Sequence, residues 1–137
     1  MARRGIEDLS TGSPFVGPAG QDLELWEEVE AMLAESDGGG PRVLKLSTPK
    51  YTIYFGTGNT VSFVEYFDWC TGRGYVARPP KGPAAAFPAE FRTRGESLSV
   101  APGCLMPLRS ALGIVRCFFE RDEPPATVQW VAAPHKH

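Results

Sequence analysis

Few residues in this sequence of 137 have side chains that commonly carry out chemistry, and their spacing limits what they can do. The histidines, His135 and His137, lie in the last three residues, where chains usually fray. The cysteines, Cys70, Cys104 and Cys117, have no C-x-x-C spacing. A zinc site or a disulfide framework needs more or closer ligands. We therefore expect no metal site, no histidine-dependent catalysis, and cysteines that fill a core in a reducing compartment.

Carboxylates are the remaining candidates for general acid–base catalysis. A catalytic pair has to be held close together with divided pKa values. Glu65 and Asp68 are neighbours in a predicted strand, but their opposite parity places them on different faces. A hydrolase that uses either of them is kept as a hypothesis, although a salt bridge at a sheet edge explains them more simply.

Phosphate and nucleic-acid binding are also disfavoured. The glycine run 38–40 follows a predicted helix and has no Lys-Ser/Thr pair after it, unlike a phosphate loop. Fourteen basic and sixteen acidic side chains give a formal net charge of −2, whereas nucleic-acid binders usually have a basic excess. We expect no cofactor and interpret a set of basic residues as a solvated loop: Arg73, Arg78, Lys81, Arg92 and Arg94.

The composition predicts one globular domain. It is 42% hydrophobic, 11% aromatic and 22% charged, and no apolar stretch is long enough to cross a membrane. The paired arginines near the start have no apolar stretch after them, so we expect a cytoplasmic protein. The glycine- and proline-rich residues 1–20 predict a flexible N-terminal arm, 21–133 the α+β domain, and 134–137 a tail.

Periodicity places the elements of that domain. A three- and four-residue spacing predicts a helix over 21–35, ended by glycines, and a second helix that Pro107 opens. β-Branched and aromatic runs predict strands at 42–47, 51–55, 61–67, 74–78, 96–100 and 127–131. The proline-rich residues 79–95 are predicted to form a long surface connection.

These elements indicate an α+β fold. Short glycine turns join the middle strands into an antiparallel meander. The run 61–67 is apolar on both faces, so it is predicted to be central. We expect an antiparallel sheet of about five to six strands with two helices packed on one face.

By elimination, the residues favour a binding protein over an enzyme. Trp69 lies between charged residues in a turn region, which is typical of an interface anchor. Packing of Trp69 over a sheet end is the alternative. The candidate contacts on the meander are Glu65, Asp68, Trp69 and Arg73.

The first predicted helix offers a second candidate surface. Residues 22–37 contain seven acidic side chains and no lysine or arginine. A solvated helix face explains this, and an acidic surface for a basic partner is the sharper interpretation. The candidate contacts on this helix are Glu24, Glu27, Glu28 and Glu30.

The C-terminal segment adds a resemblance. Residues 108–130, LRSALGIVRCFFERDEPPATVQW, resemble the ending of the first numbered immunity protein family of bacterial polymorphic toxin systems. Members end in a helix with a small apolar stripe, a turn with proline and a strand closing on Val-x-Trp. Val128 and Trp130 match that strand, whereas residues 121–123 replace a Thr-Gly that members often carry before the proline.

The resemblance implies a cytoplasmic antitoxin without an active site of its own. It would bind a cognate toxin C-terminal domain, as a 1:1 heterodimer, and occlude the active site of a nuclease or nucleic-acid deaminase. It would contact neither nucleic acid nor membrane directly. The alternative is a small non-catalytic ligand-binding or adaptor domain of α+β class.

Overall fold

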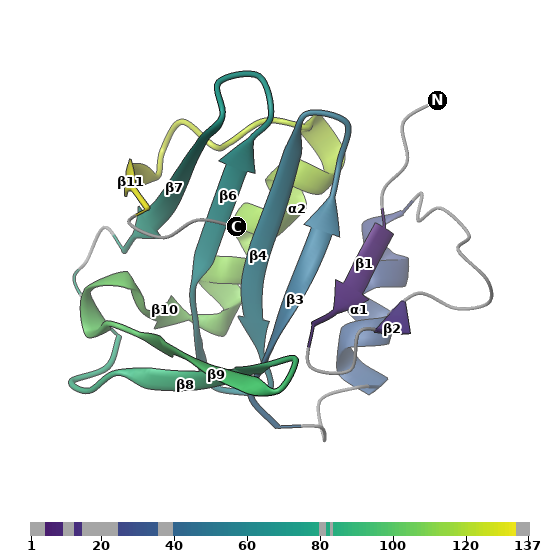
Figure 1. Cartoon of the computed structure of the whole chain (residues 1–137). Coiled ribbons are helices and arrows are strands. Elements are labelled where there is room, and N and C mark those ends of the chain that lie inside the picture. Colours follow the sequence, from purple (N-terminus) through teal and green to yellow (C-terminus); the bar gives the residue numbers. More distant parts are fainter. Residues whose placement is uncertain are drawn as a thin grey trace.

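The computed structural model describes residues 5–9, 13–14, 25–35, 40–79, 82 and 84–133 (Figure 1). These residues form two α-helices, α1 (Trp26–Glu35) and α2 (Leu108–Arg121), and a 3-10 turn at Pro102–Cys104. Their strands are β1 (Gly5–Asp8), β2 (Ser13–Pro14), β3 (Arg42–Ser47), β4 (Tyr51–Thr57), β5 (Val61–Ser62), β6 (Val64–Asp68), β7 (Arg73–Arg78), β8 (Ala89–Thr93), β9 (Glu96–Val100), β10 (Met106–Pro107) and β11 (Gln129–Ala132).

Nine of the described strands form one curled sheet. Its order is β11-β7-β6-β4-β3-β1-β2, with β8 attached to β3 and β9 to β8. All neighbours are antiparallel except β3 and β8, which share one parallel bridge between Arg42 and Arg92. The α+β class is therefore confirmed, whereas the predicted strand number of five to six is too low.

The predicted meander is present in the middle of this sheet. β4, β6 and β7 pair in succession, so β6 lies between two strands, as its two apolar faces indicate. The predicted strand 61–67 is divided into β5 and β6 at Phe63. Opposite this break, the side chain of Ser62 accepts the N–H of Gly56 at 3.1 Å and donates to its carbonyl at 2.7 Å. The hydroxyl thus satisfies backbone groups that a regular ladder would pair.

Two additional strands lie in segments without a strand pattern. Ala89–Thr93, inside the predicted surface connection 79–95, form β8, so that prediction is wrong for these residues. Gly5–Asp8, inside the predicted arm 1–20, pair with β3. Both strands are short and gain their stability from the neighbours they pack on, a contribution that local composition does not reveal.

The helix predictions differ from the structure at their starts. α1 begins at Trp26, and residues 21–24 of the predicted helix lie outside the described residues. α2 begins at Leu108, with Pro107 as its N-cap residue. The helical positions Trp26, Val29 and Leu33 are buried, as the three- and four-residue spacing requires.

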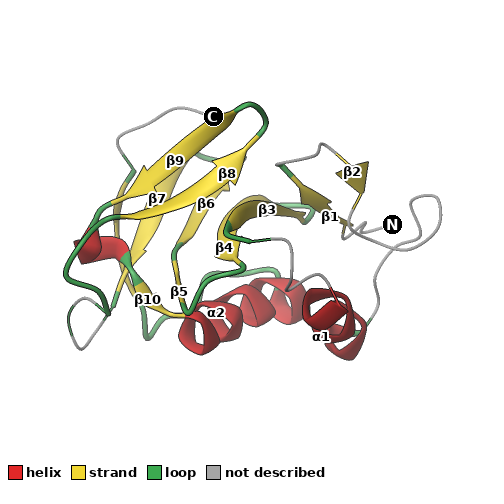
Figure 2. Cartoon of the chain, turned by 90° about the horizontal axis from the view of Figure 1, so that it is seen from below, coloured by secondary structure: helices red, strands yellow, loops and turns green. Residues whose placement is uncertain are grey.

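The helices share one hydrophobic core cluster with the sheet, here the helix cluster. Trp26 of α1 meets Phe119 of α2 edge-on, with ring centroids 5.7 Å apart, and Figure 2 shows the two helices next to each other. The sheet contributes alternate residues of β3, β4 and β6: Leu44, Leu46, Ile53, Phe55, Val64 and Tyr66. Tyr66 lies at the centre of its aromatic part, in contact with the rings of Tyr51, Tyr75, Phe118 and Trp130.

The intervening residues of the same strands face a second core, here the hairpin cluster. Its buried members are Val43, Phe63, Phe91, Val100 and Leu105. Phe91 of β8 is fully buried and meets Phe63 edge-on at 5.2 Å. A Cβ on Gly56 would lie 2.4 Å from the Phe91 ring, so the absent side chain of Gly56 makes room for the β8–β9 hairpin.

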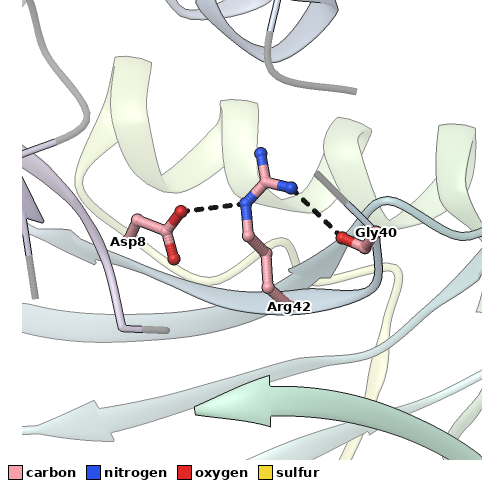
Figure 3. Close-up of polar contacts among 3 residues, drawn as sticks. All are labelled: Asp8, Gly40 and Arg42. Carbon is pink, nitrogen blue, oxygen red and sulfur yellow. Dashed lines mark hydrogen bonds and ion pairs between the residues drawn. The ribbon is translucent and has the colours of Figure 1, made fainter. Parts of the chain in front are cut away.

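A buried ion pair joins β1 to the start of β3 (Figure 3). Arg42 Nε lies 2.9 Å from Asp8 Oδ2, and the two side chains are 4% and 12% exposed. Arg42 also donates from Nη1 to the Gly40 carbonyl at 3.1 Å. The next residue, Leu9, donates its N–H to the carbonyl of Val43 at 3.0 Å. These contacts fix the end of β1 beside the hairpin cluster.

Replacing Gly56 tests the packing of the hairpin. We expect Gly56→Ala to lower the free energy of unfolding by about 1–3 kcal/mol, because the added methyl overlaps a buried ring in a packed core. Gly113→Ala is the matched control, since a Cβ at Gly113 of α2 meets nothing within 4 Å. The control should gain about 0.5–1 kcal/mol from helix propensity. Urea denaturation measures both changes, and equal stability of the two variants would contradict the packing.

The phenol of Tyr66 predicts a loss of stability in alkali. Burial, then Tyr75, Tyr51 and Asp68, raises the pKa of Tyr66 from 10.0 to about 12. The neutral phenol is therefore favoured in the folded state. Its contribution is fully present below the unfolded pKa of about 10 and is lost as the pH rises through the folded value.

We expect Tyr66→Phe to flatten the fall in unfolding free energy above about pH 10, measured by urea denaturation across the alkaline range. A smaller slope will remain, because burial also raises the pKa of Tyr51 and of Tyr54. An unchanged slope in the variant would show that Tyr66 does not cause it.

Candidate functional site

The turn between β6 and β7 presents three of the predicted contact residues together. Asp68 closes β6 and is paired with Arg73, which opens β7. The carboxylate of Asp68 accepts the N–H of Cys70 at 2.9 Å, and its carbonyl accepts that of Gly72 at 2.8 Å. Gly72 has a φ of +72°, which favours glycine at this position.

Trp69 is exposed but held in place. Its side chain is 64% exposed. The indole Nε1 donates to Thr52 Oγ1 at 2.9 Å, and the ring meets Phe67 edge-on at 4.7 Å. Its backbone N–H donates to the carbonyl of Lys50 at 3.1 Å. An aromatic side chain fixed in this way loses little conformational entropy when a partner covers it.

Carboxylates from another part of the chain extend the negative charge of this turn. Tyr51 is a neighbour of all of them: burial raises its pKa, and the charges of Asp68, Asp122 and Glu123 raise it further. Asp122 and Glu123 follow α2 and are not among the contacts predicted from the sequence. Their distance along the chain leaves no local signal that they lie near Asp68.

Glu65 is placed differently from the other predicted meander contacts. It is 3% exposed and lines a cavity of about 180 Å³ with Tyr54 and Phe63, on the face of the hairpin cluster. Asp68 does not line this cavity. The two carboxylates of the hydrolase hypothesis are therefore not gathered around one cavity.

The acidic helix α1 forms a separate surface. Glu27, Glu28 and Glu30 are exposed, and Glu24 lies outside the described residues. Glu28 Oε1 accepts the N–H of Leu25 at 2.9 Å and so satisfies a free donor at the helix start. On α2, Glu120 raises the pKa of Arg116 most, and Glu27 and Glu30 add to the effect. Part of the acidic face is thus balanced by Arg116.

The exposed large hydrophobic side chains of the described residues lie on three separate segments. Trp69 is in the β6–β7 turn, Leu25 precedes α1 and is 60% exposed, and Phe87 lies between β7 and β8 and is 78% exposed. Neither Leu25 nor Phe87 is among the contacts predicted from the sequence. Trp69 adjoins Asp68 and Arg73 of the first predicted surface, and Leu25 adjoins Glu28 of the second.

The described residues hold neither a cluster of metal-ligand side chains nor a helix that could span a membrane. No group of three or more histidine, cysteine, aspartate or glutamate side chains is arranged to hold a metal ion. None of the helices there has the length and apolar character needed to cross a membrane.

A small α+β domain that holds an exposed tryptophan rigidly among charged side chains has the features of a protein-binding domain. The family model described as Immunity protein Imm1 matches residues 18–132. The chain therefore belongs to this immunity protein family, and the resemblance seen in the C-terminal segment is confirmed. A search of curated proteins found no match.

The exposure of the β6–β7 turn predicts the order in which the thiols react. Cys70 is exposed, whereas Cys104 and Cys117 are partly covered, and burial raises the pKa of Cys117. Since the thiolate is the reactive form, we expect Cys70 to react with a disulfide reagent at least about tenfold faster than Cys117. Stopped-flow absorbance resolves the kinetic phases of the thiol reaction with the reagent. The variant Cys70→Ser should lack the fastest phase. Three equal rates would contradict this geometry.

Proposed function

We propose that this protein binds a cognate toxin domain and blocks its active site. Membership of the Imm1 family carries the proposal, and the rigid, exposed Trp69 beside carboxylates supports it. We further propose that the toxin is a nuclease or a nucleic-acid deaminase, that the complex forms in the cytoplasm, and that this chain has no catalytic role in it. The substrate groove of such a toxin is basic, because it holds phosphates.

The binding surface we propose is the β6–β7 turn with Asp68, Trp69 and Arg73. The helices share the helix cluster with alternate residues of β3, β4 and β6. Trp69 donates to Thr52, an intervening residue of β4, so it lies toward the other face of the sheet. The carboxylates near the turn would speed the encounter with a basic groove, and the covered tryptophan would slow release. The glutamates of α1 are the second candidate surface.

A standard interface fits the size of this protein. A specific complex covers about 800 Å² on each partner. The exposed surface here is 7867 Å², so such a contact takes up about a tenth of it. A single contact of this size is enough to hold one toxin domain, and we therefore propose a 1:1 complex.

The alternative is a small ligand-binding or adaptor domain. Cavities that bind drug-sized ligands measure about 300–1,000 Å³. The cavity lined by Glu65 measures about 180 Å³ and is smaller than these. A second hollow measures about 330 Å³, but it is lined by Glu7, Leu9, Thr93 and Arg94 and so lacks the mostly apolar lining of such sites, which disfavours the alternative. A secreted protein with a variable C-terminal domain encoded next to this gene would support the toxin-binding function, and its absence would favour the alternative.

Binding to the toxin domain encoded beside this gene tests the surface. We expect Trp69→Ala to weaken the complex by about 30-fold or more, because a buried aromatic anchor contributes at least about 2 kcal/mol. Asp68→Lys should slow association, since it reverses a charge that steers a basic partner. Phe87→Ala is the matched control, as another strongly exposed aromatic side chain on a different loop.

Surface plasmon resonance separates the two rates, and co-expression with the toxin scores survival. Unchanged affinity in both Trp69→Ala and Asp68→Lys would remove the β6–β7 turn, and variants of Glu27 and Glu30 would then test α1. A toxin that neither binds the wild-type protein nor loses activity beside it would contradict the function itself.

A further inference from the structure

The cavity at Glu65 is built from three parts of the fold that are distant in sequence. Its base is the hairpin-cluster face of β3, β4 and β6, and its wall is the end of the β8–β9 hairpin. Leu9, directly after β1, closes it on a third side. Figure 1 shows the β8–β9 hairpin crossing one end of the sheet, where Arg92 of β8 pairs with Arg42 at the start of β3.

The parts that form the cavity are fixed independently of it. Arg92 donates its backbone N–H to the carbonyl of Pro41 at 3.1 Å, and Phe91 is buried against Gly56. The ion pair of Arg42 with Asp8 holds the end of β1 beside the cavity. The cavity is therefore formed before any partner arrives, and filling it requires little rearrangement.

The chemistry of the lining favours a cation with an aliphatic stem. Val43, Phe63 and Leu98 supply apolar walls, whereas Glu65 and Glu96 supply two carboxylates. Among the described residues that line the cavity there is no lysine or arginine, and Arg94 lines a neighbouring hollow together with Glu7. Lys45, on the same face of β3, forms an ion pair with Glu7 at 3.6 Å.

The electrostatics of Tyr54 agree with a negative cavity. Burial raises the pKa of this phenol, and the charges of Glu65 and then Glu7 raise it further. A negative charge that disfavours a phenolate favours an ammonium or guanidinium group at the same place.

The volume limits the occupant to a single side chain. The cavity of about 180 Å³ is well above the roughly 10–15 Å³ that a single water needs. It is smaller than the cavities that hold drug-sized ligands, at about 300–1,000 Å³. A lysine or arginine side chain, which pairs methylene groups with a charged end, matches both the size and the lining.

We propose that this cavity receives one lysine or arginine side chain of the toxin. The charged end of that side chain would pair with Glu65, while its methylenes contact Val43, Phe63 and Leu98. This proposal rests on the proposed function and adds a second contact to it. Trp69 donates from its indole to Thr52, which lies on the same face of β4 as Tyr54 of the cavity, and this supports one continuous surface.

A small-molecule probe tests the cavity without the toxin. The probe is propylguanidinium, with neutral propylurea as its matched control, titrated into the full chain and followed by the backbone amide NMR signals. We expect saturable shifts at Leu9, Ser97 and Leu98 with a Kd in the millimolar range for propylguanidinium only. Glu65→Gln should abolish them. Equal shifts with propylurea, or no saturation, would overturn the proposal.

Toxin binding tests the same cavity in the complex. We expect Glu65→Gln to weaken the complex by about 30-fold or more, as loss of one partner of a buried interfacial charge pair does. Glu120→Gln, the same change on exposed α2, is the control and should change affinity less than threefold, or about 0.7 kcal/mol. Thermal unfolding of each variant confirms that it is folded.

A second variant guards against misfolding of Glu65→Gln. Thr93→Phe fills the cavity from the hairpin and leaves Glu65 in place, and it should weaken the complex similarly. If both variants bind like wild type, the cavity is not a contact, while the toxin-binding function stands. If propylguanidinium binds and the wild-type protein does not bind the toxin, the function fails and the cation site remains.

Discussion

The contact between Gly56 and Phe91 determines how this sheet is covered. Phe91 is fully buried where any side chain at position 56 would lie, so the β8–β9 hairpin rests directly on β4. The hairpin then covers Val43 and Phe63, whose neighbours Leu44 and Val64 face the helix cluster. Both faces of the central strands are therefore covered at this end of the sheet, which explains why the run 61–67 is largely apolar on both sides. Without this contact the cavity at Glu65 would lose its outer wall.

The buried ion pair of Arg42 and Asp8 complements this contact at the other side of the cavity. Removing two charges from water is costly, and their attraction offsets that cost only with good geometry and further hydrogen bonds. Here the guanidinium also donates to the Gly40 carbonyl. An apolar pair of similar volume would hold the strands as tightly. The backbone ladder with β3 sets the register of β1, and the ion pair with Arg42 closes that ladder at Asp8, next to Leu9 at the cavity.

Sequence periodicity predicted the elements that carry their own signal. The helix stripes, the glycine turns and the alternating faces of 61–67 follow from the residues themselves, and so do the α+β class and the family resemblance. β1 and β8 were missed, because a run of four or five residues beside glycine or proline gains its order from partners far along the chain. The sequence also grouped Glu65 with Asp68 and Trp69 by proximity. The sequence does not show that Glu65 is buried, because its burial depends on the packing of Phe91 against Gly56.

One interface of ordinary size can reach both Trp69 and the cavity. Glu65 and Trp69 are four positions apart, so the chain between them spans at most about 14 Å, at roughly 3.3–3.6 Å per residue. A patch of about 800 Å² is about 30 Å across, so it covers both points with margin for a polar rim. The two contacts do different physical work: the tryptophan removes apolar surface from water, and the carboxylate selects a cation by its charge. A partner that matches only one of them loses the other, so discrimination between related toxins follows from the spacing of the two contacts.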